Sequence, residues 1–151
     1  MTEERNFGGR RCLFGEGLKP AIGWVTGFAR AGWPTLLVGE TGVGKELFAR
    51  LYHELSGRSH FPFVAIDVGQ FPASLAEDEF FGHKKGAWTG AASDRAGRFE
   101  EAGAGTAFVD EIGDQTREVQ AKLMRAIAER EVSRIGENLV RRLSCALVFA
   151  T

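Results

Sequence analysis

Residues 39–45, with the sequence GETGVGK, have the composition and spacing of a phosphate-binding loop. They follow the apolar run 35–38 and precede a helical pattern. Glycine lets backbone N–H groups turn toward an anion with no side chain in the way, and a helix N-terminus adds partial positive charge. Lys45 adds a full charge for the β- and γ-phosphates of a nucleotide. The alternative, a tight turn that carries a surface lysine, is disfavoured by the full spacing.

The residue after the lysine is Glu46, where a phosphate loop usually has Ser or Thr to hold Mg²⁺. A carboxylate can also ligate Mg²⁺, directly or through water. The sequence leaves open whether Glu46 does so. The residues expected to bind the nucleotide are Gly39, Glu40, Thr41, Gly42, Val43, Gly44, Lys45 and Glu46.

Two adjacent acids, Asp110 and Glu111, follow the apolar run 106–109. In a parallel sheet, the carboxyl ends of such strands meet at the phosphate loop. Asp110 would then hold Mg²⁺, directly or through its water shell. Glu111 would orient the attacking water and accept its proton. The alternative is a solvated acidic turn, which the upstream phosphate loop disfavours.

Residues 84–91, with the sequence KKGAWTGA, place one aromatic ring between small residues and glycines. Such a tip can present Trp88 and Thr89 to a partner, or it can be a buried turn with Trp88 in the core. Exposed aromatics occur but are uncommon, so the residue pattern alone favours neither. The candidate partner-binding residues are Gly86, Ala87, Trp88, Thr89, Gly90 and Ala91.

Composition indicates one soluble globular domain. The 151 residues are 44% hydrophobic and 26% charged, and the formal net charge of −1 lacks the basic excess of a chain-wide nucleic-acid surface. No apolar run approaches the ~20 residues of a membrane span, and the polar N-terminus is not a signal peptide. Cys12 and Cys145 stand apart, with no ligand-spaced Cys or His beside them, which argues against a disulfide framework or a zinc site. We therefore expect a cytoplasmic protein.

Strand and helix patterns alternate along the chain, which predicts the α/β class with a three-layer core. Continuous apolar runs of this kind are typical of parallel strands buried on both faces. The predicted strands are 35–38, 63–68, 106–109 and 145–151, and the predicted helices are about 19–30, 46–56, 74–81 and 117–130. Because the last apolar run reaches Thr151, we expect a truncated domain over residues 19–151, preceded by an N-terminal segment, 1–18.

Together these residues resemble the AAA+ ATPase domain of sigma-54-dependent transcriptional activators, the bacterial enhancer-binding proteins. Residues 39–46 resemble the Walker A motif of that family, including the acid after the lysine, and residues 105–113 resemble its Walker B motif. Residues 81–91 resemble its signature loop, usually written GAFTGA, with Trp88 in place of Phe. The match continues through residues 97–100, 120–125 and 129–131, and residues 150–151 resemble the start of sensor I.

The resemblance implies a P-loop NTPase (AAA+) fold, a three-layer α/β/α sandwich with a parallel sheet, incomplete here at the C-terminus. It implies ATP and Mg²⁺ as cofactors and a homo-oligomeric ring, a hexamer, in the full-length protein. That ring would hydrolyse ATP and use the loop around Trp88 to remodel sigma-54 RNA polymerase holoenzyme and so activate transcription.

The family also has the strand order five, one, four, three, two. Its fifth strand, arginine fingers, sensor II and DNA-binding domain would all lie beyond Thr151. We therefore expect DNA contact only through a domain absent here, and almost no ATPase activity from residues 1–151 alone.

One departure from the family concerns Asp67, which matches an Asn that contacts the catalytic Glu and senses nucleotide. Asp67 and Glu111 would lie close together, and like charges at short range favour a shared proton. Nucleotide switching would then work differently or fail. Two other functions stay open: a nucleotide-binding interaction module without turnover, and another AAA+ remodelling ATPase, which residues 86–91 argue against.

Overall fold

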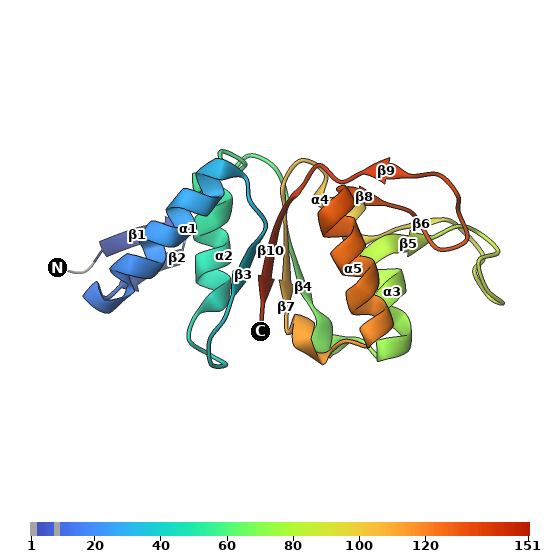
Figure 1. The fold of residues 1–151 in the computed structure, drawn as a ribbon, viewed down its shortest axis with the longest axis horizontal. Coiled ribbons are helices and arrows are strands. Elements are labelled where there is room, and N and C mark those ends of the chain that lie inside the picture. Colours follow the sequence, from blue (N-terminus) through green and yellow to red (C-terminus); the bar gives the residue numbers. More distant parts are fainter. Residues whose placement is uncertain (1–2, 8–9) are drawn as a thin grey trace.

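The computed structural model describes residues 3–7 and 10–151, with side chains from residue 15 onward except those of Ala73 and Asp114. A four-stranded parallel sheet lies at its centre, in the order β3-β10-β7-β4 (Figure 1). The strands are β3 (Thr35–Leu37), β4 (Phe63–Asp67), β7 (Thr106–Asp110) and β10 (Ala146–Ala150). The order agrees with the one, four, three, two that the resemblance predicts for these strands.

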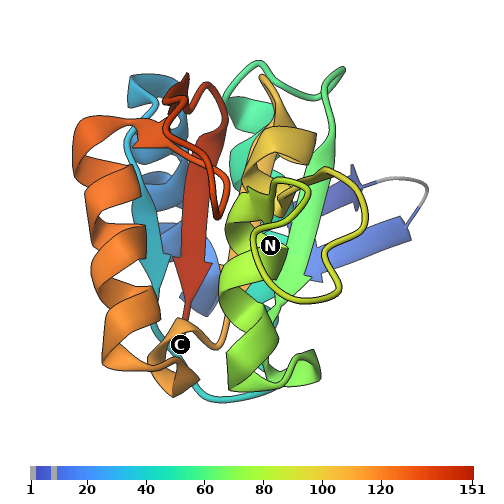
Figure 2. The ribbon, with the colours of Figure 1, turned by 90° about the vertical axis from the view of Figure 1, so that its right-hand side faces the viewer.

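Helices cover both faces of this sheet, so the predicted three-layer α/β/α architecture is confirmed. Figure 1 shows the helices on either side of the sheet, and Figure 2 looks onto one of these layers. One face carries α1 (Lys19–Ala31) and α2 (Lys45–Leu55), and the other carries α3 (Ala73–Phe81), α4 (Arg98–Ala102) and α5 (Arg117–Glu129). The four predicted helices agree with α1, α2, α3 and α5 to within one residue at each end.

The two central strands are fully enclosed, whereas the two outer strands are not. Residues 106–109 of β7 and all five residues of β10 are buried. Alternate residues of β7 serve the two faces: Phe108 packs with α1 and α2, while Ala107 and Val109 pack with the helices opposite. Our prediction that all four strands are buried on both faces is therefore wrong for β3 and β4. Each of these has one sheet neighbour instead of two, and each leaves side chains in solvent.

Short elements complete the fold. Three 3₁₀ turns are η1 (Glu16–Leu18), η2 (Val68–Gln70) and η3 (Ile112–Asp114). Three antiparallel pairs stand outside the main sheet: β1 (Glu3–Phe7) with β2 (Arg10–Phe14), β5 (Gly82–His83) with β6 (Arg95–Ala96), and β8 (Glu131–Val132) with β9 (Arg141–Arg142). The sequence had suggested no strands in segment 1–18. Among the described residues, no helix has the length and apolar character needed to cross a membrane.

Candidate functional site

The loop between β3 and α2 has the backbone that the glycine pattern predicts. Gly42 and Gly44 adopt φ angles of 83° and 91°, in the left-handed region where a side chain would be strained. Gly44 is also the N-cap of α2, whose first residue is Lys45. The glycines therefore turn the chain straight from a strand into a helix N-terminus, which concentrates partial positive charge at the loop.

Lys45 folds back over this loop. Its Nζ donates to the carbonyl oxygens of Gly39, at 2.9 Å, and Glu40, at 3.2 Å. Both partners are neutral, so neither offers the ammonium the charge–charge attraction that a phosphate would. The ammonium group thus lies at the helix N-terminus with neutral partners that an anion could replace.

Glu46, the next residue, is engaged on the surface of α2. Its Oε1 accepts from Arg50 Nε at 2.9 Å and from Arg50 Nη2 at 2.7 Å. The guanidinium of Arg50 also lies 4.5 Å from the ring centre of Phe63. One carboxylate oxygen of Glu46 is thus paired with Arg50, and whether Glu46 also ligates Mg²⁺ stays a prediction.

The predicted acids lie together at the carboxyl edge of the sheet. The parallel register of β4 and β7 sets Asp67 directly beside Asp110, and paired strands are about 4.8 Å apart. The phosphate loop, η2 and η3 occupy the same edge, the lower one in Figure 1. The topology therefore brings Asp67, Asp110 and Glu111 to the end of the sheet that carries the phosphate loop.

Glu111 leaves β7 through an uncommon backbone conformation. Its φ of 57° and ψ of 38° are left-handed, which costs a non-glycine residue about 1 kcal/mol. Its N–H donates to Asp110 Oδ1 at 3.0 Å. The bend carries the Glu111 side chain toward η2, where a Cβ on Gly69 would lie 2.8 Å from Glu111 Oε2 and 3.4 Å from Asp67 Oδ1. The carboxylates of Asp67 and Glu111 thus border the same glycine.

Asp67 is held by donors from the turn that follows it. Its Oδ1 accepts from the N–H of Gly69 at 3.1 Å, and its Oδ2 accepts from Gln70 Nε2 at 2.8 Å. Sequence reasoning missed both donors. A glycine and a glutamine after a strand carry no signal of a site until the fold sets the glycine beside Glu111.

Thr151 links the two halves of the site. Its N–H donates to Leu37 at 3.1 Å, and its carbonyl accepts from Gly39 at 3.3 Å. A Cβ on Gly113 would lie 3.0 Å from Thr151 Oγ1. The position that resembles sensor I therefore sits between the phosphate loop and the turn after the acidic pair.

The loop around Trp88 is separate from this edge. It joins β5 to β6 and extends beyond α3, away from the phosphate loop (Figure 1). The Trp88 side chain is 41% exposed, and its ring lies 4.3 Å from that of His83 at 61°. The exposure of Trp88 argues against a core residue, whereas the role of the loop in binding a partner stays a prediction.

The donor set fits a magnesium ion that is shared with a nucleotide. Among the described residues, no three His, Cys, Asp or Glu side chains gather to hold a metal ion by themselves. Mg²⁺ normally keeps several waters and takes one or two carboxylates together with phosphate oxygens. A single strand-end carboxylate beside a phosphate loop, as Asp110 is, suits such a site.

Comparison with known proteins identifies the family. The sigma-54 interaction domain profile matches residues 16–151. The chain belongs to this family. Its sequence is 53% identical over 116 residues to the sigma54-dependent transcriptional activator SfnR of Pseudomonas putida, covering 77% of this chain and 32% of that protein. It is 51% identical over 123 residues to a Nif-specific regulatory protein of Azorhizobium caulinodans, covering 82% of this chain and 20% of that protein.

Solved structures agree with this assignment. NtrX from Brucella abortus, crystallised with ADP, superimposes with a TM-score of 0.80 at 26% identity, over 93% of this chain and 30% of that one. The crystal structure of the same protein with ATP gives a TM-score of 0.77, over 91% of this chain and 30% of that one. The fold is thus that of the AAA+ domain of a sigma-54-dependent transcription regulator. This chain spans about a fifth to a third of the length of these relatives.

Proposed function

We propose that this sigma-54 interaction domain binds ATP with Mg²⁺ at residues 39–46 and hydrolyses it to remodel sigma-54 RNA polymerase. The observation that carries the proposal is the shared sheet edge, where a phosphate loop that ends in Lys45 at a helix N-terminus lies at the same end of the sheet as strand-end carboxylates. The relative NtrX, crystallised with ADP and with ATP, supports the choice of nucleotide.

Three residues divide the proposed chemistry. Lys45 exchanges its two carbonyl partners for phosphate oxygens and fixes the end of the nucleotide. Asp110 would hold Mg²⁺, which when bound neutralises charge on the β- and γ-phosphates. Glu111, turned toward η2 by its left-handed backbone, positions a water and accepts its proton.

The remaining assignments are also proposals. Residues 86–91 engage sigma-54, and the whole protein works as a homo-oligomeric ring in the cytoplasm, where the transcription machinery lies. Asp67 occupies the position at which the family's Asn would contact Glu111, and its bonds to Gly69 and Gln70 give it fixed partners. Whether Asp67 and Glu111 share a proton stays a prediction.

A second candidate is a nucleotide-binding interaction module without turnover. The observation that favours it is the placement of two carboxylates around Gly69, since their repulsion can disturb the water that Glu111 must position. Such a module would bind ATP and sigma-54 but release no phosphate.

The deciding experiment measures three quantities on the whole protein that contains this domain, not on residues 1–151 alone: affinity for a fluorescent ATP analogue, phosphate release, and capture of sigma-54 with ADP and aluminium fluoride. Lys45→Ala should lose nucleotide affinity, and with it the capture of sigma-54. Binding and capture without phosphate release would select the module. Unchanged nucleotide affinity in Lys45→Ala would contradict both candidates.

A further inference from the structure

His83 is a buried histidine that plays no part in the proposed nucleotide chemistry. It is the last residue of β5, at the root of the loop that carries Trp88. Its Nδ1 lies 2.6 Å from Oδ1 of Asp78, which is also buried, on α3. The imidazole is therefore tied to the body of the domain by one short hydrogen bond.

Asp78 is itself fixed from the other strand of the hairpin. Its Oδ2 accepts from Arg95 Nη1 at 2.8 Å, and Arg95 lies on β6 and also pairs with Glu79. Both oxygens of Asp78 thus have partners, so the carboxylate cannot swing without breaking a charged contact. This second anchor gives the His83 ring a single orientation beneath the loop.

The indole of Trp88 rests on this ring. The ring centres are 4.3 Å apart at 61°, an edge-to-face contact. The tip itself is closed by backbone bonds from Gly86 to Ala91, at 2.9 Å, and from Ala91 to Trp88, at 3.1 Å. Glycines at both ends of residues 86–90 leave the tip few side chains with which to restrain the indole.

The contact between Trp88 and His83 is strong enough to favour the docked position of the indole and weak enough for a binding partner to displace it. Edge-to-face aromatic pairs shift an equilibrium by roughly 2- to 12-fold at 25 °C beyond their area burial. Trp88 is 41% exposed, so part of its surface is already in solvent while the indole lies against His83. The docked ring therefore lies at the surface of the domain and is not part of the core.

We propose that His83, oriented by Asp78, is a positioning residue that docks Trp88 against the domain and competes with sigma-54 for the indole. The identity of the partner, sigma-54, rests on the proposed function. The contact between Trp88 and His83 can be measured without nucleotide and without sigma-54. Partner binding must then displace the indole from His83 before the loop can engage.

Docking is measured on the whole chain with Trp88 as its one tryptophan, after Trp24→Phe and Trp33→Phe. In His83→Ala the acrylamide quenching constant of Trp88 should rise at least 2-fold, whereas His83→Phe, which keeps a ring, should restore the parent value. The matched control is His60→Ala, since His60 also lies against an aromatic ring, that of Phe61, at 4.2 Å. Equal quenching in the parent and His83→Ala would overturn the docking.

A second readout needs no substitution at His83 and so decides the matter even if His83→Ala does not fold. In the single-tryptophan parent, the fluorescence anisotropy of Trp88 should decay mainly with the tumbling of the whole chain. A dominant nanosecond decay from free indole rotation would overturn the docking.

Competition is tested by capture of sigma-54 by the whole protein that contains this domain, in the trapped nucleotide state. His83→Ala should bind sigma-54 about 2- to 12-fold more tightly than the parent. If His83→Ala raises the acrylamide quenching of Trp88 but binds sigma-54 no more tightly than the parent, the competition is overturned and the docking stands. If the parent captures no sigma-54, the proposed function fails, while the two fluorescence measurements still decide whether His83 docks Trp88.

Discussion

Glu111 shows how a single backbone conformation can prepare a residue for chemistry. A side chain that continued β7 would alternate with Asp110 across the sheet, but the left-handed turn sends Glu111 toward η2 instead. Strain of this kind persists only where the surroundings fix it, and it is concentrated at functional sites. Its place beside Gly69 gives the proposed base a defined position relative to Asp67.

Glu111→Gln should therefore retain ATP affinity and lose phosphate release by about 10²- to 10⁴-fold, because an amide cannot accept the proton of water. The assay is single-turnover phosphate release in a parent that hydrolyses ATP. Asp67→Asn is the matched variant, since it makes the same change on the other side of Gly69 and should keep or raise turnover. Comparable turnover in Glu111→Gln and the parent would refute the assignment of the base.

His53 should make stability depend on pH. It is buried, its Nδ1 lies 2.8 Å from Thr106 Oγ1, and burial, followed by the charges of Arg50 and Arg58, lowers its pKa. A lowered pKa in the folded state means that the unfolded chain takes up the proton first. The contribution of neutral His53 to stability is thus complete above about pH 6.5 and is lost as the pH falls below it.

The free energy of unfolding should fall between pH 7 and pH 5 by at most roughly 1.4 kcal/mol per pH unit for this group. Urea unfolding of the parent, His53→Gln and His60→Gln at several pH values measures it. His53→Gln should flatten the pH dependence, whereas His60→Gln, at an exposed position, should not. A parent slope that survives in His53→Gln would assign the effect to other groups.

At the scale of elements, three segments meet at Gly105. Its N–H donates to Ala102 at the end of α4, its carbonyl accepts from Ala146 of β10, and Thr106 donates to Pro62 just before β4. A Cβ here would lie 1.9 Å from the Pro62 carbonyl oxygen. The start of β7 can approach these neighbours only because this residue has no side chain.

Gly105→Ala should accordingly destabilise the domain by about 1–3 kcal/mol, the usual cost of forcing atoms into a packed site. Gly27→Ala is the control. Gly27 lies within α1 with open space around its position, so alanine there should stabilise the helix by roughly 0.5–1 kcal/mol. In thermal unfolding, the melting temperature should fall for Gly105→Ala and rise for Gly27→Ala. A Gly105→Ala protein as stable as the parent would show that the junction can relax.

The sequence predicts the features that depend on residues close together along the chain, and it misses those that depend on residues far apart. The helices α1, α2, α3 and α5 and the four sheet strands carry their own periodicity or apolar runs, so their bounds were close. The pair β5–β6 has two residues in each strand and α4 has five residues in all, too few to show a period. The docking of Trp88 on His83 and the closeness of Gly69 to Glu111 are tertiary contacts, which no local pattern encodes.

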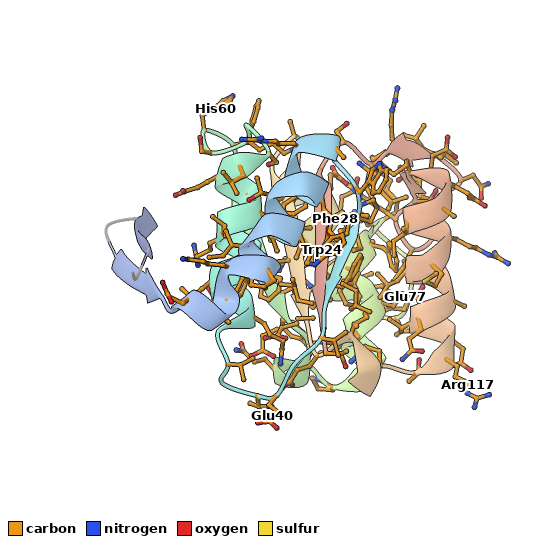
Figure 3. The ribbon with its side chains drawn as sticks, turned by 60° about the vertical axis from the view of Figure 1, so that its left-hand side comes forward. Trp24, Phe28, Glu40, His60, Glu77 and Arg117 are labelled. Atoms are coloured by element: carbon orange, nitrogen blue, oxygen red, sulfur yellow. The ribbon has the colours of Figure 1, made fainter. Side chains whose placement is uncertain are left out.

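At the scale of the whole molecule, the outer strand β3 is the apolar margin of the sheet. Leu36 and Val38 are 55% and 77% exposed. Hollows of about 390 Å³ and 330 Å³ lie on the two sides of the strand, and Thr35 and Leu36 border both. On the α1 side, Trp24 and Phe28 stack at 6.0 Å in the foreground of Figure 3. An apolar strand edge with unpaired backbone is a template for association with other chains.

We expect the purified 151-residue chain to self-associate at micromolar concentration through this margin. Leu36→Lys places a charge at the centre of β3 and should shift the chain toward monomer, because lysine on an edge strand blocks strand-to-strand pairing. Leu139→Lys is the matched control, since Leu139 is similarly exposed, at 58%, but lies in the connection between β8 and β9. Sedimentation velocity over a concentration series measures the populations. A parent that stays monomeric, or an equal rise in the monomer fraction in Leu139→Lys, would show that the β3 edge does not drive association.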